Sequence, residues 1–342
     1  MALEHSVLNE QKIVALLKEY WGVSVMKVEK MPLGSANCYR VTNSSEKYFL
    51  KEFQSSFQSE DLIREAELTN YLAEYDIPTA RFVPTKDGEK YIEFQGHCIC
   101  VEEYIEGEQF GYYDFPKKFL KKEAAMLGKI HQCLSGYYLP ISMDETWVDS
   151  FSVERAHKKY DEMLCELENH KTDQLYDKIK EELRYKKELA EYCEDLKKYY
   201  AGITYVSTHG DYQGCQLIFD DENIKAVIDF SSAKKIPAVW ELMRSYVQSS
   251  EYCRCEARID IREFCEYVKE YMRYFPLTEA DLKAMPYVYL FQLARSRFGY
   301  IQYLTSDSED RRGLISFAFW RTAICKHLKE NAEEILKAIL SI

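Results

Sequence analysis

The stretch from residue 205 to residue 232 constrains the fold of this chain more than any other. Two short apolar runs, 217–219 and 226–228, flank an acidic turn. Runs of this length on either side of a four-residue turn predict two strands of a β-hairpin. Asp211 stands before the first strand and Asp229 directly follows the second. A hairpin brings its two ends together, so we expect these two carboxylates to lie close to each other.

The polar residues around the predicted hairpin are the types that serve phosphoryl transfer. Gln216 offers an amide oxygen just before the first strand, between Asp211 and Asp229 in the sequence. Mg²⁺ in proteins is usually held by one or two carboxylates together with substrate phosphates. Kinases need one Asp to orient the acceptor hydroxyl, and an Asp with an amide to hold the metal. The pattern therefore indicates a kinase-type reaction, whereas an ordinary hairpin with solvated acids is the plainer interpretation.

The spacing of these residues resembles the catalytic core of the aminoglycoside phosphotransferase and choline kinase-like family. His209-Gly210-Asp211 is followed after four residues by Gln216, and later by Ile228-Asp229-Phe230. The family pattern has Asn where this chain has Gln216, so the geometry of metal binding at this position is open. The resemblance implies ATP as phosphoryl donor, with GTP as an alternative, and Mg²⁺ as cofactor. It also implies that Asp211 is the catalytic residue and that Gln216 and Asp229 bind the metal.

The resemblance further implies an α+β fold, the bilobal protein kinase-like fold. A small antiparallel-sheet N-lobe that binds nucleotide would take residues 1–103. A larger, mostly helical C-lobe with the catalytic loop and the acceptor site would take residues 104–342. The apolar positions after residue 115 recur at helical spacing and agree with this division.

A lysine in an apolar strand marks the expected nucleotide site. Lys51 stands among Phe49, Leu50 and Phe53, which is unusual for a surface lysine. A kinase lysine in such a strand contacts the nucleotide phosphates and is steadied by a helix carboxylate. The helix predicted over 61–75 offers Glu65 and Glu67. Glu65 shares its face with apolar residues three and seven positions later, so we predict that Glu65 is the partner of Lys51.

Three further nucleotide contacts follow from the resemblance alone. Ser35 lies in a small-residue turn where the family has its nucleotide-covering loop. The carbonyl of Glu103 and the amide of Ile105 lie at the end of the last predicted N-lobe strand, where the family binds the adenine edge. An ordinary strand end is the alternative for both.

Several residues in the helical half have open or structural interpretations. His131 is expected to be a packed structural histidine, and Glu241, by resemblance, anchors the loop near Asp229. Arg295 and Arg297 either line the acceptor cleft or pair with acids, and we favour pairing. The charged helices over 153–200 are most simply solvated, but they could supply an acidic acceptor site.

Charge and cysteine content exclude several classes of function. The chain has 45 basic and 57 acidic residues, a net charge of −12, which argues against a nucleic-acid partner. No apolar run approaches the ~20 residues of a membrane span, and the first residues do not resemble a signal peptide. We therefore expect a cytoplasmic protein with no membrane partner. The eleven scattered cysteines indicate reduced thiols, and the oligomeric state is not predicted.

The sequence thus predicts an ATP-dependent O-phosphotransferase that acts on a hydroxyl of a small acceptor, either cationic or neutral. Aminoglycosides, other antibiotics, choline-like amines and homoserine-like alcohols all remain open as acceptors. The alternative is a catalytically degenerate, kinase-shaped protein that binds a ligand or has a structural role, similar to spore-coat relatives. Gln216 suggests this alternative, because it replaces the Asn of the family pattern. A protein kinase is disfavoured because a helix is predicted within twelve residues of Asp229, which leaves no room for a long activation segment.

Overall fold

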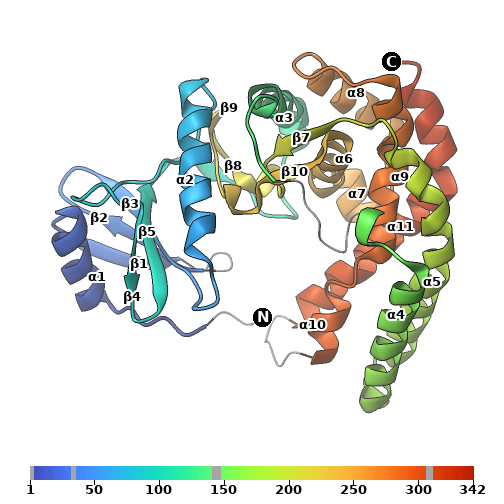
Figure 1. Cartoon of the computed structure of the whole chain (residues 1–342), viewed down its shortest axis with the longest axis horizontal. Helices are drawn as coiled ribbons and strands as arrows, with labels where there is room; N and C mark the ends of the chain where they lie inside the picture. The colour runs from blue at the N-terminus through green and yellow to red at the C-terminus, as the bar shows by residue number, and fades with distance from the viewer. Residues whose placement is uncertain (1–3, 32–35, 141–147, 306–310) are drawn as a thin grey trace. The chain divides into compact units, whose positions relative to one another are not determined.

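The computed structural model describes residues 4–31, 36–140, 148–305 and 311–342 and forms two compact units (Figure 1). The N-terminal unit extends to Gln109 and also includes Gln216–Ser232. The C-terminal unit consists of Phe110–Cys215 and Ala233–Ile342. The short strand β6, Glu108–Gln109, pairs with a strand of the hairpin and so lies in the N-terminal unit, beyond the boundary predicted after residue 103.

A five-stranded antiparallel sheet forms the frame of the N-terminal unit. Its strands follow the spatial order β1-β2-β3-β5-β4. Their bounds are β1, Lys27–Met31; β2, Asn37–Thr42; β3, Lys47–Glu52; β4, Tyr91–Phe94; and β5, His97–Glu103. Alternation and turn residues predict strands over 23–31, 38–42, 48–53, 91–94 and 97–104, and the structure has each of them to within a few residues. The same signals predict a strand over 81–84, which is reduced to a single bridge between Phe82 and Glu102; Pro84 has no N–H to donate to a strand ladder.

The two faces of this sheet are covered by different helices. Alternate strand residues such as Leu50, Ile99 and Val101 pack against α1, Glu10–Leu16, and the π-helical turn that continues it. The opposite face, with Cys38, Cys98 and Cys100, packs against apolar residues of α2, Ser59–Glu74. Both faces are therefore buried, and a charged side chain that points toward α2 must find its partners inside the protein.

The hairpin predicted around residue 220 is confirmed. Strands β8, Leu217–Asp220, and β9, Asn223–Val227, pair antiparallel, and Leu217 lies opposite Val227. The turn places Asp221 in the left-handed region, at φ 51°, which Asp tolerates better than most residues. The backbone N–H of Ile228 donates to the carbonyl of Gln216 at 3.0 Å. The two ends of the hairpin therefore lie side by side.

The C-terminal unit is mostly helical, as predicted. A two-stranded sheet of β7, Tyr205–Thr208, and β10, Lys234–Pro237, flanks the catalytic-loop region. The helices are α3, Leu120–Leu134; α4, Val153–Leu167; α5, Tyr176–Leu196; α6, Ala238–Ser249; α7, Glu251–Glu256; α8, Ile261–Met272; α9, Glu279–Arg295; α10, Tyr300–Thr305; and α11, Arg311–Ile339. The protein kinase-like α+β fold is thus confirmed.

One helical stretch is interrupted where the sequence suggested continuity. The sequence of 279–304 predicts helix throughout, but α9 ends at Arg295 and α10 begins at Tyr300. Gly299 adopts φ 89°, and a Cβ at this position would lie 2.4 Å from the carbonyl oxygen of Leu314. Only glycine fits this close approach, so the chain turns here and leaves Ser296 to Phe298 outside regular structure.

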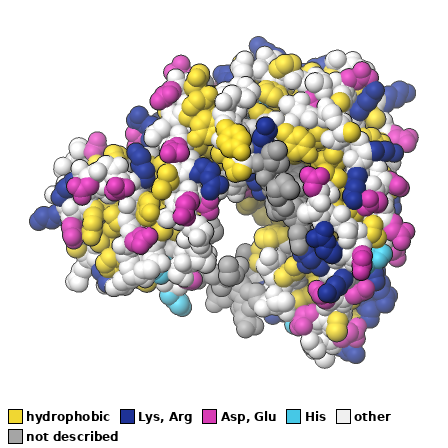
Figure 2. Space-filling model, viewed as in Figure 1, with side chains coloured by type: hydrophobic (Ala, Val, Ile, Leu, Met, Phe, Trp, Pro, Cys, Tyr) yellow, Lys and Arg dark blue, Asp and Glu magenta, His cyan; other side chains and the backbone are white. Residues whose placement is uncertain are grey.

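The charged side chains and the cysteines are distributed as the composition led us to expect. Acidic and basic side chains are interspersed over the face shown in Figure 2. All eleven cysteines lie in the described ranges, and none forms a disulfide. Cys98 and Cys100 belong to the core between the sheet and α2, so packing accounts for this closely spaced pair. Among the helices of the described residues, none is long and apolar enough to cross a membrane.

Candidate active site

Lys51 lies at the centre of the sheet face that α2 covers. Strand pairing places Lys51 between Cys38 of β2 and Cys100 of β5. Its Nζ lies 2.7 Å from Oε1 of Glu102, and both side chains are almost entirely buried. Burial alone would lower the pKa of Lys51, but Glu102, followed by Glu65 and Asp229, outweighs this effect and raises the pKa well above its usual value. Lys51 is therefore charged, and its ammonium group is fixed in place.

Glu65 projects from α2 into the same cluster, as its position on the apolar helix face predicted. It is only 4 % exposed, whereas Glu67 on the same helix is exposed. Burial raises the pKa of the Glu65 carboxyl to about 8, although Lys51 and the backbone N–H of Phe230 act against this rise. Oε2 of Glu65 has no hydrogen-bond partner among the described residues. Glu65 is thus an electrostatic neighbour of Lys51, while the ion pair itself is formed by Glu102.

This cluster has more carboxylates than cations. Glu102, Glu65 and Asp229 all act on the charge of Lys51, and burial raises the pKa of Glu102 as well. A buried carboxylate oxygen without a donor carries a free-energy cost that an added cation or donor can relieve. The cluster therefore fits a bound cation. Within the described ranges, however, no group of three or more His, Cys, Asp or Glu side chains could hold a metal by itself.

Asp229 lies at the exit of the hairpin in a strained backbone conformation. Its φ is 65°, in the left-handed region, and the Ser231 hydroxyl donates to its Oδ1 at 2.7 Å. Strained residues of this kind persist where the surrounding structure fixes them, which is frequent at functional sites. Gln216 is buried next to it, because the hairpin pairs the Gln216 carbonyl with the N–H of Ile228. Asp229 and Gln216 together supply one carboxylate and one amide, a set that suits Mg²⁺ when phosphates complete the shell.

Asp211 belongs to the C-terminal unit, whereas Asp229 belongs to the N-terminal unit. The proximity of these two carboxylates therefore stays a prediction. The backbone on either side of Asp211 is held by Glu241 of α6, whose carboxylate accepts from the N–H groups of His209 at 3.1 Å, Gly210 at 2.5 Å and Tyr212 at 3.4 Å. The Asp211 side chain is about one third exposed.

Glu241 is a completely buried anchor, but it accepts from the loop around Asp211, whereas the resemblance implied the loop near Asp229. Besides the loop amides it accepts from Nε2 of His131 at 3.0 Å, and Nδ1 of His131 contacts the Tyr271 hydroxyl at 2.6 Å. Burial would raise the pKa of Glu241, but the hydrogen bond and charge of His131, together with the nearby His209 and Arg244, lower it. The expected structural role of His131 is confirmed.

Arg244, one turn further along α6, holds the side chain of Asp211. Its Nη2 donates to Oδ1 of Asp211, and its Nη1 donates to the carbonyl of Tyr212 at 3.3 Å. Burial acts to lower the pKa of Arg244, but Asp211 raises it. Gln213 Nε2 lies 3.5 Å from the other carboxylate oxygen. The carboxylate is thus oriented by cationic and amide donors.

The three other residues predicted to contact the nucleotide lie in different surroundings. Glu103 ends β5, pairs with Tyr48 across the sheet and forms an ion pair with Arg81 at 2.6 Å. Ile105 follows in the half-buried connection to β6. Ser35 lies outside the described residues. Nucleotide binding by all three stays a prediction.

Two residues that contribute to the site were missed by sequence reasoning. Glu102 was hidden because its approach to Lys51 depends on the pairing of β3 with β5, and the charge pattern of one strand does not reveal this pairing. Arg244 lies 33 residues from Asp211. Its signal was an arginine three positions after Glu241 in the same helix, separated from it by two apolar residues.

Comparison with known proteins agrees with this geometry. The profile of the Phosphotransferase enzyme family matches residues 28–275. A homoserine kinase of Zymomonas mobilis is 24% identical over 263 residues, which cover 76% of this chain and 75% of that protein.

Solved structures share the fold at lower identity. A spectinomycin phosphotransferase in complex with ADP and spectinomycin has a TM-score of 0.61 at 16% identity, and the match covers 98% of this chain and 100% of that one. A microcompartment-associated aminopropanol kinase has a TM-score of 0.62 at 13% identity, covering 95% and 98%. The profile match spans well over half of the chain and includes Lys51, Asp211 and Asp229. The chain therefore belongs to the phosphotransferase enzyme family and is a phosphotransferase.

Proposed function

We propose that this protein is an ATP-dependent small-molecule kinase that transfers the γ-phosphoryl group to a hydroxyl of its acceptor. The observation that carries the proposal is the buried group of Lys51, Glu102 and Glu65 with the exposed Asp229 acting on it, which holds one fixed ammonium group among excess carboxylates. Such a cluster is poised for a nucleotide bound with a divalent cation. The ADP complex of a structurally similar phosphotransferase supports this assignment.

Each residue has a role that its surroundings support. Lys51, fixed by Glu102, contacts the nucleotide phosphates, and Glu65 keeps the ammonium group in this orientation. Asp229 and Gln216 hold Mg²⁺, which, when bound, neutralises charge on the transferred phosphoryl group. Ser35, Glu103 and Ile105 complete the nucleotide site.

Asp211 orients the acceptor. Its carboxylate accepts a hydrogen bond from the acceptor hydroxyl and takes the proton as the oxygen attacks phosphorus. Arg244 positions this carboxylate by donating to Oδ1, while Oδ2 lies 3.5 Å from Nε2 of Gln213. The Glu241 anchor holds the loop, so the geometry does not depend on the bound substrate.

The acceptor that we propose is a small alcohol, and an amino alcohol in particular. The homoserine kinase and the aminopropanol kinase both carry such a compound in their names. The acidic surplus of the chain favours a substrate with a positive group. GTP is an alternative donor, and a cytoplasmic location is part of the same proposal.

Nucleotide binding is tested by thermal denaturation. Mg·ATP at 100 times its dissociation constant should stabilise the fold by about 2.7 kcal/mol. Lys51→Met should lose most of this gain. Lys47→Met is the matched control, because Lys47 lies on the same strand but is partly exposed and pairs with Glu106 at the surface.

Turnover is tested by ATP consumption over a set of amino alcohols and neutral alcohols. Consumption that depends on one acceptor supports the kinase. Nucleotide binding without turnover for any acceptor would favour the second candidate, a degenerate kinase-shaped binding protein. The observation behind this candidate is Gln216, which stands where the family has Asn. If neither Mg·ATP nor Mg·GTP shifts the melting temperature, the kinase proposal is wrong.

A further inference from the structure

Arg321 of α11 carries a charge that phosphoryl transfer does not use. Its Nε atom is fully buried and has no hydrogen-bond partner among the described residues. Its Nη2 donates to Oε1 of Gln292 at 3.3 Å, and within the described ranges no carboxylate pairs with the guanidinium. Burial lowers the pKa of Arg321, and the nearby charge of Arg244 adds to this effect, although Tyr289 acts against it. An anion bound at Arg321 would relieve the cost of this charge.

A series of side-chain contacts within the C-terminal unit connects Arg321 with Asp211. The guanidinium of Arg321 lies over the ring of Phe317, 5.7 Å from its centroid. The rings of Phe317 and Tyr112 lie with their centroids 6.4 Å apart. The hydroxyl of Tyr112 accepts from Nε2 of Gln213 at 3.1 Å, and the same Nε2 lies 3.5 Å from Oδ2 of Asp211. Arg321 is therefore connected to the loop of Asp211 through two aromatic rings and one amide.

A second connection runs through α9, which packs against both α6 and α11. Tyr289 and Gln292 are three residues apart on α9, so they share a face of this helix. Gln292 accepts from Arg321. Burial raises the pKa of Tyr289 to about 12, while the charges of Arg321 and Arg244 act against this rise. Because Arg244 also donates to Asp211, Asp211 and Arg321 are neighbours of the same face of α9.

Aromatic side chains next to Arg321 are exposed. Tyr112 is 48% exposed and Phe298 is 44% exposed. The ring of Phe298 lies 6.1 Å from that of Phe317, which in turn stacks on Trp320 at 5.3 Å. Single exposed aromatic residues are common, but rings that contact one another beside polar groups are typical of binding surfaces. The surface beside Arg321 thus suits the carbon chain of a small molecule.

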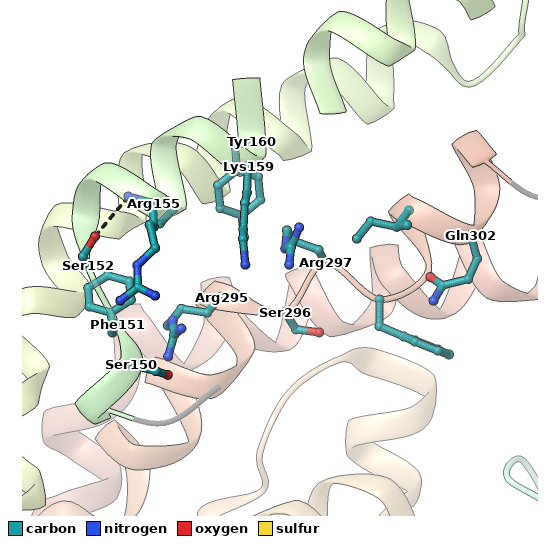
Figure 3. A pocket seen from close by; sticks show the side chains of 13 residues that line it. Ser150, Phe151, Ser152, Arg155, Lys159, Tyr160, Arg295, Ser296, Arg297 and Gln302 are labelled. Atoms are coloured by element: carbon teal, nitrogen blue, oxygen red, sulfur yellow. Dashed lines mark hydrogen bonds between the residues drawn. The ribbon is translucent and has the colours of Figure 1, made fainter. Parts of the chain in front are cut away.

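Phe298 also forms part of the wall of a cavity of about 250 Å³ between the start of α4 and the end of α9 (Figure 3). This volume is near the lower end of the ~300–1,000 Å³ typical of small-molecule sites. Arg295 and Arg297, whose roles the sequence left open, line the same cavity; their expected pairing with acids stays a prediction. Space for a compact ligand therefore adjoins the aromatic side chains.

The chemistry at Arg321 favours a carboxylate. A guanidinium offers its N–H donors in a planar fork that matches the two oxygens of a carboxylate, and a ring stacked on it restricts its orientation. The Arg321 side chain is half-buried. Its Nη1, which donates to no described residue, is not among the fully buried atoms, so an incoming group can reach it. A cationic group at this position would meet a like charge.

We propose that Arg321 binds a carboxylate of the acceptor, so that the acceptor is a small hydroxy acid whose carbon chain contacts Tyr112, Phe298 and Phe317. The inference rests on the proposed function, since it places the acceptor hydroxyl at Asp211. It narrows the acceptor from a small alcohol to one that also carries an acid group. An amino group on the same molecule agrees with the acidic surplus of the chain.

The test compares hydroxy amino acids with the amines that differ from them only by loss of the carboxylate: L-serine with ethanolamine, and L-homoserine with propanolamine. Initial rates of ATP consumption by the full chain should give the better acid a kcat/KM roughly tenfold or more above that of its amine. Arg321→Gln should bring the two values together through a higher KM for the acid. Arg321→Lys, which keeps the charge without the fork, should retain part of the preference.

The matched control is Arg312→Gln, at an exposed position of the same helix. It should change kcat/KM for either compound by less than about twofold, as is usual for surface substitutions. The comparison of acid with amine in the wild type needs no variant, so it decides the case even if Arg321→Gln fails to fold.

Binding without nucleotide separates this inference from the proposed function. In thermal denaturation, the preferred acid should raise the melting temperature of the wild type and of Arg312→Gln, but not that of Arg321→Gln. If this pattern appears while no acceptor supports ATP consumption, the kinase proposal is wrong and the carboxylate site stands. The inference is overturned if each amine reacts as well as its acid, or if Arg321→Gln keeps the full shift. It is also overturned if the acids neither react nor shift the melting temperature of the wild type at millimolar concentration.

Discussion

Glu65 of the N-terminal unit and Glu241 of the C-terminal unit are both buried glutamates on helices, yet their pKa values shift in opposite directions. Glu241 accepts from backbone amides and from His131, and its pKa is lowered. Glu65 has one oxygen without a hydrogen-bond partner in the described structure, and burial raises its pKa to about 8. The number of donors around the carboxylate, and not burial itself, separates the two.

This difference separates a structural site from a binding site. A carboxylate whose donors all come from the protein is satisfied before any ligand arrives and can fix a loop. A carboxylate in a cluster with too few donors gains from an added cation or a bound substrate. By this criterion the loop around Asp211, in the C-terminal unit, is preorganised, while the cluster around Lys51 is completed by its ligands.

Replacement of Asp211 should have the largest effect. Because Glu241 holds the loop backbone, Asp211→Asn should keep the loop in place and remove only the proton acceptor. Turnover should fall ~10²–10⁴-fold, with nearly unchanged affinity for nucleotide, measured by initial rates and by titration. Asp220→Asn, an exposed position on the hairpin, is the control and should be fully active. Full activity in Asp211→Asn would contradict the assigned role.

Replacement of Glu241, the anchor of the loop, should lower the free energy of unfolding. Glu241→Ala leaves His131 and the loop amides without their acceptor, and unfolding in urea should show a loss of about 3–5 kcal/mol. Glu241→Gln, which keeps an acceptor oxygen, should lose less. Because the folded pKa of Glu241 is lowered, its contribution is present above the unfolded pKa of ~4.3 and is lost as pH falls through the folded value. A Glu241→Ala protein as stable as the wild type would remove the contrast with Glu65.

The raised pKa of Glu65 should be visible in the pH dependence of the free energy of unfolding. Because its folded pKa is raised to about 8, its contribution is fully present below the unfolded pKa of ~4.3 and is lost as pH rises toward 8. Glu65→Gln is neutral at every pH, so it should gain about 3–4 kcal/mol relative to the wild type between pH 5 and pH 8. Glu67→Gln on the same helix is exposed and should follow the wild type. Parallel curves for the two variants would show that Glu65 is satisfied after all.

Replacement of Gln216 should have the smallest effect on activity. Gln216→Ala should raise the Mg²⁺ concentration needed for half-maximal activity about tenfold, with little change in the KM of the acceptor. Gln216→Asn restores the reach typical of the family and should keep activity. Mn²⁺ should rescue the alanine variant better than Mg²⁺. An unchanged Mg²⁺ requirement in Gln216→Ala would mean that Asp229 holds the metal without this amide.

Local pattern explains what could be predicted from sequence. Alternation and turn residues defined the hairpin of β8 and β9, and helical spacing placed Glu65 inside and Glu67 outside. The partner of Lys51 could not be found in this way, because Glu102 approaches it through strand register. Arg244 reaches Asp211 only through the packing of α6 against the loop. The interruption between α9 and α10 depends on the close approach of Gly299 to the carbonyl of Leu314, and a single glycine is a weak signal in the sequence.

The hairpin also affects the order in which the protein can fold during synthesis. The N-terminal unit includes Gln216–Ser232, but these residues follow the whole segment Phe110–Cys215, which belongs to the other unit. A ribosome adds roughly 5–20 residues per second, so the first unit waits roughly 5–20 s for its last two strands after Gln109 is made. Until then the nascent N-terminal unit lacks Asp229 and Gln216. The N-terminal unit can therefore be completed only after most of the chain has left the ribosome.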